Sequence, residues 1–468
     1  MERIGIGLIV GNRGFFPDHL CKSGREKIID FLNKQGIDII SVDEKETKFG
    51  SIETYEDAKK CAEIFKKNRE KIDGIIITLP NFGDEGSIAD TLRLANLEVP
   101  VLIHAFPDEI DKMNLSNRRD SFCGKISVCN NLYQSGIKFT LTTNHTENIE
   151  DEIFKEDIDN FISVCRILKG LKNLKLGAIG TRPSPFKTVR YSEKILERYG
   201  IDVETIDLSE IFARISKLKD GDKKVKEEFE KIKGYSDTTL ISEQSILKMA
   251  KLKIVVDEWI KENNIKSIAF QCWTSIEENF GIVPCTVMSY LSNSLVPSAC
   301  EVDITGALSM YILQLASGKP SAIVDLNNNY KNEENKCVLF HCSNFPVSIM
   351  EESKVVSQEI IKNSVGEENA YGAIFGKIKS SPFTFLRLTT DDFTGKIKGY
   401  TGEGEITDDK LETFGGYGVA EIKNLQSLLK FICENGFEHH TCINLSRKSK
   451  VIKEALGRYK EWEIYNHV

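Results

Sequence analysis

The 468-residue sequence has no long hydrophobic run and no excess of basic residues, since 70 acidic against 62 basic side chains give a net charge of −8. No stretch approaches the roughly 20 apolar residues of a membrane helix. The acidic balance favours neither nucleic acid nor anionic lipid as a partner. The N-terminal "MERIGIGLIVGNRGFFP" lacks the features of a signal peptide, so we interpret it as the first strand of a cytoplasmic protein.

Cofactor motifs are also missing. Neither G-x-G-x-x-G nor G-x-x-x-x-G-K-[ST] occurs, so we expect no nucleotide cofactor. The twelve cysteines include no C-x-x-C pair, which excludes the common zinc knuckles and predicts that most are apolar core residues. With only seven histidines, the place of each one is informative.

The order of hydrophobic patterns predicts an α/β fold. Runs rich in Ile and Val, such as "RIGIGLIV" and "DGIIITLP", alternate with amphipathic helical segments, as in parallel βαβ units. The alternation restarts at "NLKLGAIG", and after Pro346 short alternating runs with Gly-rich turns are typical of an antiparallel sheet or small barrel. We therefore predict two doubly wound parallel-sheet domains, 1–170 and 171–346, and a C-terminal β-rich, antiparallel barrel-like domain, 347–468.

Acidic residues flank an apolar helix pattern in "SACEVDITGALSMYILQLASGKPSAIVDLNN", residues 298–328. Glu301 and Asp303 precede the helix, and Asp325 ends the next apolar run. Unpaired carboxylates are costly at the ends of buried elements, which suggests a partner between Glu301 and Asp325. The alternatives are a helix N-cap for Asp303 and a turn-starting residue for Asp325.

Histidines follow two other β-rich runs, His341 in "VLFHCSNFP" and His439–His440 in "FEHHTCINL". With Glu301 and Asp325 they make a possible site for a hard divalent cation, because carboxylates and imidazole suit such ions. Core histidines bound to backbone are the alternative.

These motifs, in this order, resemble the L-fucose isomerase and L-arabinose isomerase superfamily. The resemblance implies that Glu301, Asp325 and His440 hold Mn²⁺, with Mg²⁺ or Co²⁺ as alternatives. It implies that His341 is a further ligand, as in the arabinose branch. His439, the neighbour of His440, is a candidate for substrate binding.

The same resemblance implies an aldose–ketose isomerase in which Glu301 and Asp325 move a proton through a cis-enediol(ate). The substrate would be a deoxy-sugar, pentose or modified hexose, from L-fucose or D-arabinose to an anionic sugar such as sulfoquinovose. A homo-oligomer, trimer or hexamer, with the active site between subunits is also implied. A non-catalytic two-lobed sugar-binding protein is the alternative, although it predicts a signal peptide and no converging acid and imidazole set.

Further binding candidates lie at strand ends, where open α/β sheets hold ligands. Arg13 follows the first strand and is a candidate substrate ligand, in trans by the resemblance, or a surface arginine. Trp273 in "QCWTSIEENFG" is a candidate for stacking on a sugar, while Glu277 and Glu278 are expected on a helix surface, with contact to sugar hydroxyls as the alternative. Asp303 joins the substrate-binding candidates.

Overall fold

The computed structural model describes residues 3–468, which divide into two compact units between residues 169 and 170. None of the helices in this described part is both long and apolar enough to cross a bilayer.

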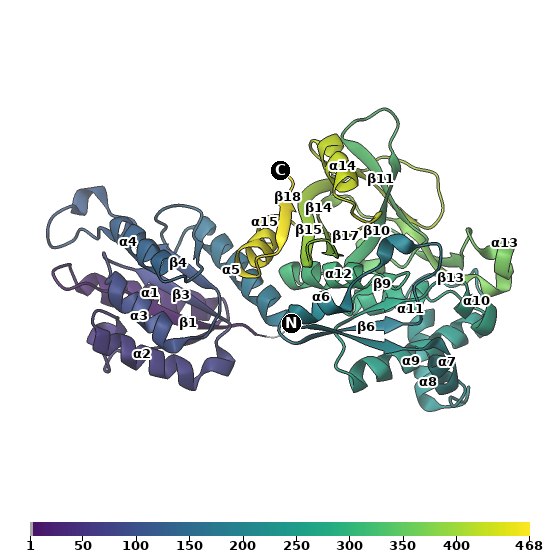
Figure 1. The fold of residues 1–468 in the computed structure, drawn as a ribbon, viewed down its shortest axis with the longest axis horizontal. Helices are drawn as coiled ribbons and strands as arrows, with labels where there is room; N and C mark the ends of the chain where they lie inside the picture. The colour runs from purple at the N-terminus through teal and green to yellow at the C-terminus, as the bar shows by residue number, and fades with distance from the viewer. Residues whose placement is uncertain (1–2) are drawn as a thin grey trace. The chain divides into compact units, whose positions relative to one another are not determined.

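The N-terminal unit is a doubly wound α/β domain. Its parallel strands follow the order β2-β1-β3-β4-β5, and helices α2, α3 and α4 cover one face while α1 and α5 cover the other (Figure 1). Burial on both faces explains the continuous Ile and Val runs of β1 and β3. The elements are β1 (Gly5–Val10), α1 (His19–Lys34), β2 (Asp38–Ser41), α2 (Tyr55–Lys67), β3 (Gly74–Leu79), α3 (Glu85–Ala95), β4 (Val101–Ala105), α4 (Ser121–Gln134), β5 (Thr140–Leu141) and α5 (Glu152–Gly170).

The C-terminal unit begins with a second parallel sheet, in the order β7-β6-β8-β9. Its strands are β6 (Leu174–Ile179), β7 (Ile201–Ile206), β8 (Ser267–Phe270) and β9 (Ser298–Cys300). The helices of this part are α6 (Glu193–Arg198), α7 (Leu208–Ile215), α8 (Lys223–Lys233), α9 (Glu243–Glu262), α10 (Ser275–Phe280), α11 (Cys285–Asn293) and α12 (Ile304–Ser317).

The remaining strands form a mixed sheet in the order β12-β13-β16-β11-β10-β17-β14-β15-β18. A further pairing of β15 with β16 closes the strands from β16 to β15 into a barrel, as the pattern after Pro346 predicts. The elements are β10 (Ser321–Asn329), β11 (Lys336–His341), β12 (Lys354–Ser357), α13 (Lys362–Val365), β13 (Tyr371–Lys377), β14 (Ser381–Asp391), β15 (Lys396–Ile406), β16 (Gly416–Glu421), α14 (Leu425–Glu434), β17 (His440–Asn444), α15 (Ser449–Lys453) and β18 (Glu463–Asn466).

The barrel takes β10 and β11 from before residue 346, so its strands come from both sides of the predicted boundary between the central and C-terminal domains. The division into three domains stays a prediction. Two strands from the middle of the chain thus lie between strands from near its end.

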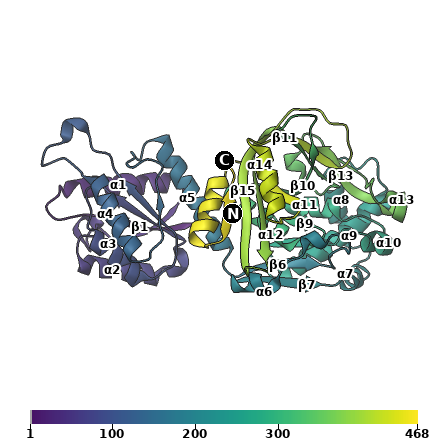
Figure 2. The same ribbon diagram turned by 45° about the horizontal axis from the view of Figure 1, so that its top comes forward.

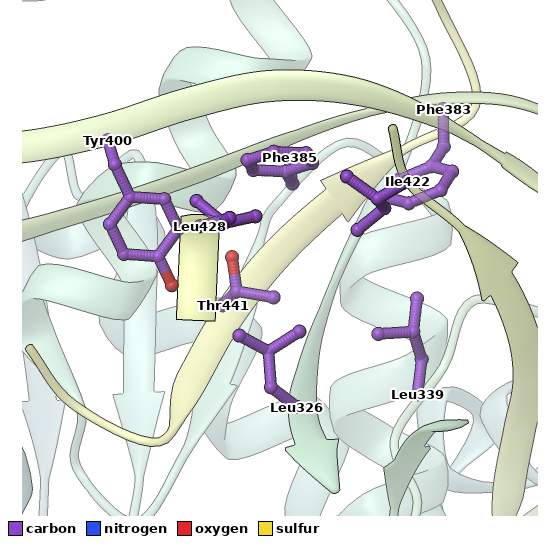
Figure 3. A pocket seen from close by; sticks show the side chains of 8 residues that line it. All are labelled: Leu326, Leu339, Phe383, Phe385, Tyr400, Ile422, Leu428 and Thr441. Atoms are coloured by element: carbon purple, nitrogen blue, oxygen red, sulfur yellow. The ribbon is translucent and has the colours of Figure 1, made fainter. Parts of the chain in front are cut away.

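Side chains fill the interior of the barrel. Phe383, Phe385, Tyr400 and Leu428 point toward one another and leave a void of about 10 Å³, about the room of one water (Figure 3). The barrel interior is therefore a packed core and not a channel for substrate.

Helix α12 joins the two halves of the C-terminal unit. It contacts β8 and β9 of the parallel sheet on one side and β14 and β17 of the barrel on the other (Figures 1 and 2). Contact on both sides explains why its sequence is apolar all round. The residues at its N-terminus lie where the sheet and the barrel meet.

Candidate active site

Strand register brings three of the predicted metal ligands together. Asp325 on β10 pairs directly with His440 on β17 and, on its other side, with Phe340 on β11. His341 follows Phe340 at the end of the same strand. Cross-strand neighbours lie about 5 Å apart, so residues separated by more than a hundred positions in sequence become adjacent.

Glu301 reaches the same place from the parallel sheet. It follows β9 directly, at the carboxyl edge where open α/β sheets bind ligands. Glu301 and Val302 both have left-handed backbone conformations, with φ of 60° and 57°. Such conformations cost about 1 kcal/mol or more in residues other than glycine, and they cluster at functional sites. Here they form the sharp turn into α12.

Three buried polar atoms converge without partners. His440 Nε2 lies 3.8 Å from Glu301 Oε2 and 3.6 Å from Asp325 Oδ1. None of the three atoms has a hydrogen-bond partner within residues 3–468. Because burying unpaired polar atoms costs several kcal/mol, this arrangement fits a cation bound between them. Two carboxylate oxygens and an imidazole nitrogen suit Mn²⁺ or a similar divalent ion.

The orientation of His440 is fixed from behind by Asp303. Asp303 Oδ2 accepts a hydrogen bond from His440 Nδ1 at 2.9 Å, which leaves the Nε2 lone pair facing the two acids. Asp303 also caps α12 by accepting from Gly306 N at 2.8 Å, so the N-cap alternative is correct. Since its side chain is fully buried, Asp303 positions His440, and the predicted contact with substrate has no place in this geometry.

A buried ion-pair chain supports Asp303. Arg387 donates to both oxygens of Asp303, at 2.5 and 3.1 Å, and its Nε donates to Glu438 at 3.0 Å. Burial raises the pKa of Asp303, but the charge of Arg387 outweighs it and holds the pKa well below its usual range. Asp303 is therefore an anion and a strong acceptor for His440.

Protonation of the site follows from its burial. Burial raises the pKa of Glu301 to about 7, and the nearby charge of Asp325 adds to this effect. Burial lowers the pKa of His440, but its hydrogen bond to Asp303 and the surrounding acids raise it above the ordinary value overall. Without a cation, the site therefore holds protons that a bound ion would replace.

The rings of the other two histidines of the cluster lie close to that of His440, His341 at 5.5 Å and His439 at 4.1 Å between ring centres. His341 is buried, and its ligand atom lies within 4.8 Å of those of Asp325 and His440. His439 is exposed over 37% of its side chain, with Nε2 3.5 Å from Asp325 Oδ1, and belongs to a similar group with Glu301 and His440. Burial lowers the pKa of His439 to about 4, so its ring is neutral at physiological pH.

A pocket of about 430 Å³ opens onto this cluster. Trp273 lies in its wall with Phe186, their ring centres 5.8 Å apart, and Phe186 also stacks on His439 at 6.1 Å. The indole nitrogen of Trp273 is buried without an acceptor in the described chain, so it can donate to a ligand. The lining consists of Phe186, Trp273, Glu301, Asp325, Leu326, Asn327, Phe340, His341, Cys342, Ile360 and His439.

Arg13 lies in the N-terminal unit, just after β1. Its guanidinium pairs with Glu85, lies 3.8 Å from Asp84 Oδ2 and stacks over Phe82 at 4.5 Å. In this unit the side chain is thus held at the carboxyl edge of the sheet, where a ligand of a doubly wound domain binds.

Several residues of the site were not identified by the sequence analysis. Phe186 follows a Gly/Pro loop that carries no motif, and Glu438 lies next to the histidine pair. Arg387 could have been recognised in the sequence, because it is a lone cation within the apolar strand "FTFLRL". The expectation that Glu277 lies on a helix surface is wrong, because its side chain is fully buried. Glu278 is exposed, as expected.

Comparison with known proteins gives two family matches. Residues 7–172 match the fucose/sulfoquinovose isomerase N-terminal domain, and residues 339–467 match the L-fucose isomerase C-terminal domain. The second match contains His341 and His440, and the first contains Arg13.

Curated relatives agree with the family matches. A sulfoquinovose isomerase of Alkalicoccus urumqiensis is 26% identical over 317 residues, 66% of this chain and 69% of that protein. A sulfoquinovose isomerase of Priestia aryabhattai is 27% identical over 199 residues, 42% of this chain and 44% of that protein. One from Clostridium sp. (strain MSTE9) is 26% identical over 205 residues, 43% of this chain and 44% of that protein. The chain therefore belongs to the fucose isomerase-like family of aldose–ketose sugar isomerases.

Proposed function

We propose that this protein is a divalent-metal-dependent isomerase that converts an aldose into its ketose, the aldose being a deoxy-sugar, pentose or modified hexose, with sulfoquinovose as the first candidate substrate. Membership of an enzyme family argues against the alternative of a non-catalytic two-lobed sugar-binding protein. The names of the relatives support sulfoquinovose, and L-fucose, D-arabinose and L-arabinose remain candidates.

The observation that carries the proposal is the convergence of three orphaned buried atoms, Glu301 Oε2, Asp325 Oδ1 and His440 Nε2. These residues would hold a divalent cation, Mn²⁺ by preference, with His341 as a further candidate ligand. A bound ion of this kind would supply electrophilic polarisation of the sugar carbonyl.

Glu301 and Asp325 are our candidates for proton transfer. Both line the pocket, so each can approach the carbons of a bound sugar. Isomerisation removes a proton from the carbon beside the carbonyl and returns one to the neighbouring carbon through a cis-enediol(ate), which requires a positioned general base that then acts as an acid. His440 is fixed by Asp303 and keeps its hydrogen-bonded Nδ1 proton out of this exchange.

The apolar wall of the pocket would orient the sugar. Phe186 and Trp273 offer ring faces to the C–H face of a pyranose or an open chain, and the Trp273 indole can donate to a hydroxyl. His439, neutral and partly exposed, can accept or donate a hydrogen bond at the same edge.

We further propose a homo-oligomer, trimer or hexamer, in which Arg13 of a neighbouring subunit contacts the substrate. A cytoplasmic location also stays a prediction. Shared active sites make specific activity fall when dilution dissociates the oligomer. Activity that persists at dilutions where sizing shows monomer would exclude a shared site.

The test is turnover by metal-stripped protein, with and without Mn²⁺, on sulfoquinovose, L-fucose, D-arabinose and L-arabinose, followed by NMR in D₂O. We expect Mn²⁺-dependent ketose formation with deuterium at the exchanged carbon. Glu301→Gln and Asp325→Asn should abolish it, while the exposed Glu278→Gln should not. Absence of a ketose from every sugar, despite tight Mn²⁺ binding, would refute the proposed substrate class.

A further inference from the structure

A second group of ligand atoms lies beside His341, with different chemistry. The ligand atoms of Cys300, His341 and Cys342 all lie within 4.8 Å of one another, and all three residues are buried. His341 Nδ1 is 3.4 Å from Cys342 Sγ. Two sulfurs and an imidazole form a soft donor set, in contrast to the oxygen-rich set around Glu301.

The topology brings these sulfurs together for the same reason that it builds the first site. Cys300 is the last residue of β9, directly before Glu301, and Cys342 follows the last residue of β11. Cys300 is bonded to Cys272, which follows the neighbouring strand β8. A disulfide sulfur is a poor metal ligand, because the thiolate is the form that binds. The group is therefore complete only when this bond is reduced.

We propose that the reduced protein holds a thiophilic divalent cation, such as Zn²⁺, at Cys300, His341 and Cys342. Thiolate and imidazole ligands select Zn²⁺ over Mn²⁺, whereas carboxylates favour Mn²⁺. Three protein ligands leave a fourth tetrahedral position. Cys272, freed by the same reduction, can fill it, and so can water from the pocket, which His341 and Cys342 both line.

A phosphine can reduce the Cys272–Cys300 disulfide. A phosphine transfers two electrons to the Cys272–Cys300 bond and takes an oxygen atom from water, so that it becomes a phosphine oxide. The two protons of that water appear on the two sulfurs. Zn²⁺ binding then releases one proton from each cysteine that ligates it.

Occupancy of this soft site changes the site beside it. A ring nitrogen of His341 also lies within 4.8 Å of ligand atoms of Asp325 and His440. An ion bound through Cys300 and Cys342 would therefore compete with that group for the His341 ring. We therefore expect Zn²⁺ to inhibit the reduced protein more strongly than the oxidised one, if the proposed isomerase function is correct.

The experiment uses Co²⁺ as a spectroscopic probe and does not depend on that function. The full chain, reduced with a water-soluble phosphine and desalted without oxygen, is titrated with Co²⁺. Sulfur-to-cobalt charge-transfer absorption should appear with one equivalent, and Zn²⁺ should displace it. The oxidised protein, which needs no substitution and keeps its fold, should not show this band.

Variants separate this site from others. Cys300→Ser and Cys342→Ser should each weaken the band, because each removes one thiolate of the site, whereas Glu301→Gln and Cys433→Ser, an exposed cysteine on α14, should leave its intensity unchanged. Circular dichroism establishes that each variant is folded. The proposal is wrong if the reduced protein gives no sulfur band, or if folded Cys342→Ser shows the band at the full intensity of the wild type.

Discussion

Replacing Asp303 by asparagine tests how the fold positions His440. Asp303 Oδ1 accepts from Gly306 N and Arg387, and Oδ2 accepts from His440 Nδ1 and Arg387. An asparagine has a single acceptor oxygen, so its NH₂ group must face one of these donors. If the helix cap is kept, the NH₂ group faces His440, which must then carry its proton on Nε2, toward Glu301 and Asp325.

The size of the effect follows from these contacts. Loss of a residue that orients a metal ligand costs about 10- to 100-fold in metal affinity, which equals about 1.4–2.7 kcal/mol. Breaking a buried ion pair costs about 3–5 kcal/mol of stability. We expect the lower end of that range, because Glu438 still pairs with Arg387.

The assay is Mn²⁺ titration followed by electron paramagnetic resonance of the free ion, with urea unfolding of the metal-free protein measured in parallel. Asp207→Asn is the matched control, since Asp207 caps α7 through Ser209 N but is exposed. We expect it to change neither quantity by much. If folded Asp303→Asn bound Mn²⁺ as tightly as the wild type, the role assigned to Asp303 would be wrong.

Three further predictions concern protonation and substrate contact. Burial raises the pKa of Glu277 to about 8, so the folded protein keeps a proton that the unfolded chain loses above its ordinary pKa of 4.5. The free energy of unfolding of the wild type should therefore fall, relative to that of Glu277→Gln, by up to about 1.4 kcal/mol per pH unit between pH 5 and 8. Urea unfolding measures this difference, and Glu278→Gln should show no such trend. Glu301, with a pKa of about 7, must lose its proton to bind a cation, and so must His440, whose pKa is raised. Mn²⁺ affinity in calorimetric titrations should therefore rise at least about tenfold per pH unit below pH 7; an affinity independent of pH would contradict this. Phe186→Ala should raise KM about fivefold in steady-state assays, which corresponds to about 1 kcal/mol of lost ring contact, whereas the exposed Phe393→Ala should leave KM unchanged.

The fold class could be predicted from the sequence because its signals are local. Continuous Ile and Val runs between amphipathic segments indicate parallel strands buried on both faces, as β1 and β3 are. The alternation after Pro346 indicates strands with one buried face, as in β12. Strand β14 is instead buried on both faces, because it lies between the barrel interior and α12. Local patterns do not specify which strands pair, so the entry of β10 and β11 into the barrel could not be foreseen.

The candidate site shows the same limit. Glu301, Asp325 and His440 stand out because charged or imidazole side chains end apolar elements, and the structure brings them together. Asp303 is more buried than its place at a helix start suggests, because its partner Arg387 lies 84 residues away in sequence. Pairs of this kind depend on tertiary contacts, and one sequence contains no direct signal for them.

The most direct test of the central claim is to locate the metal. Crystals of the metal-stripped protein soaked in Mn²⁺ should give an anomalous difference peak between Glu301 Oε2, Asp325 Oδ1 and His440 Nε2, and Glu301→Gln crystals should lose it. A Mn²⁺ peak elsewhere in the molecule, with these three atoms hydrogen-bonded only to water, would contradict the account.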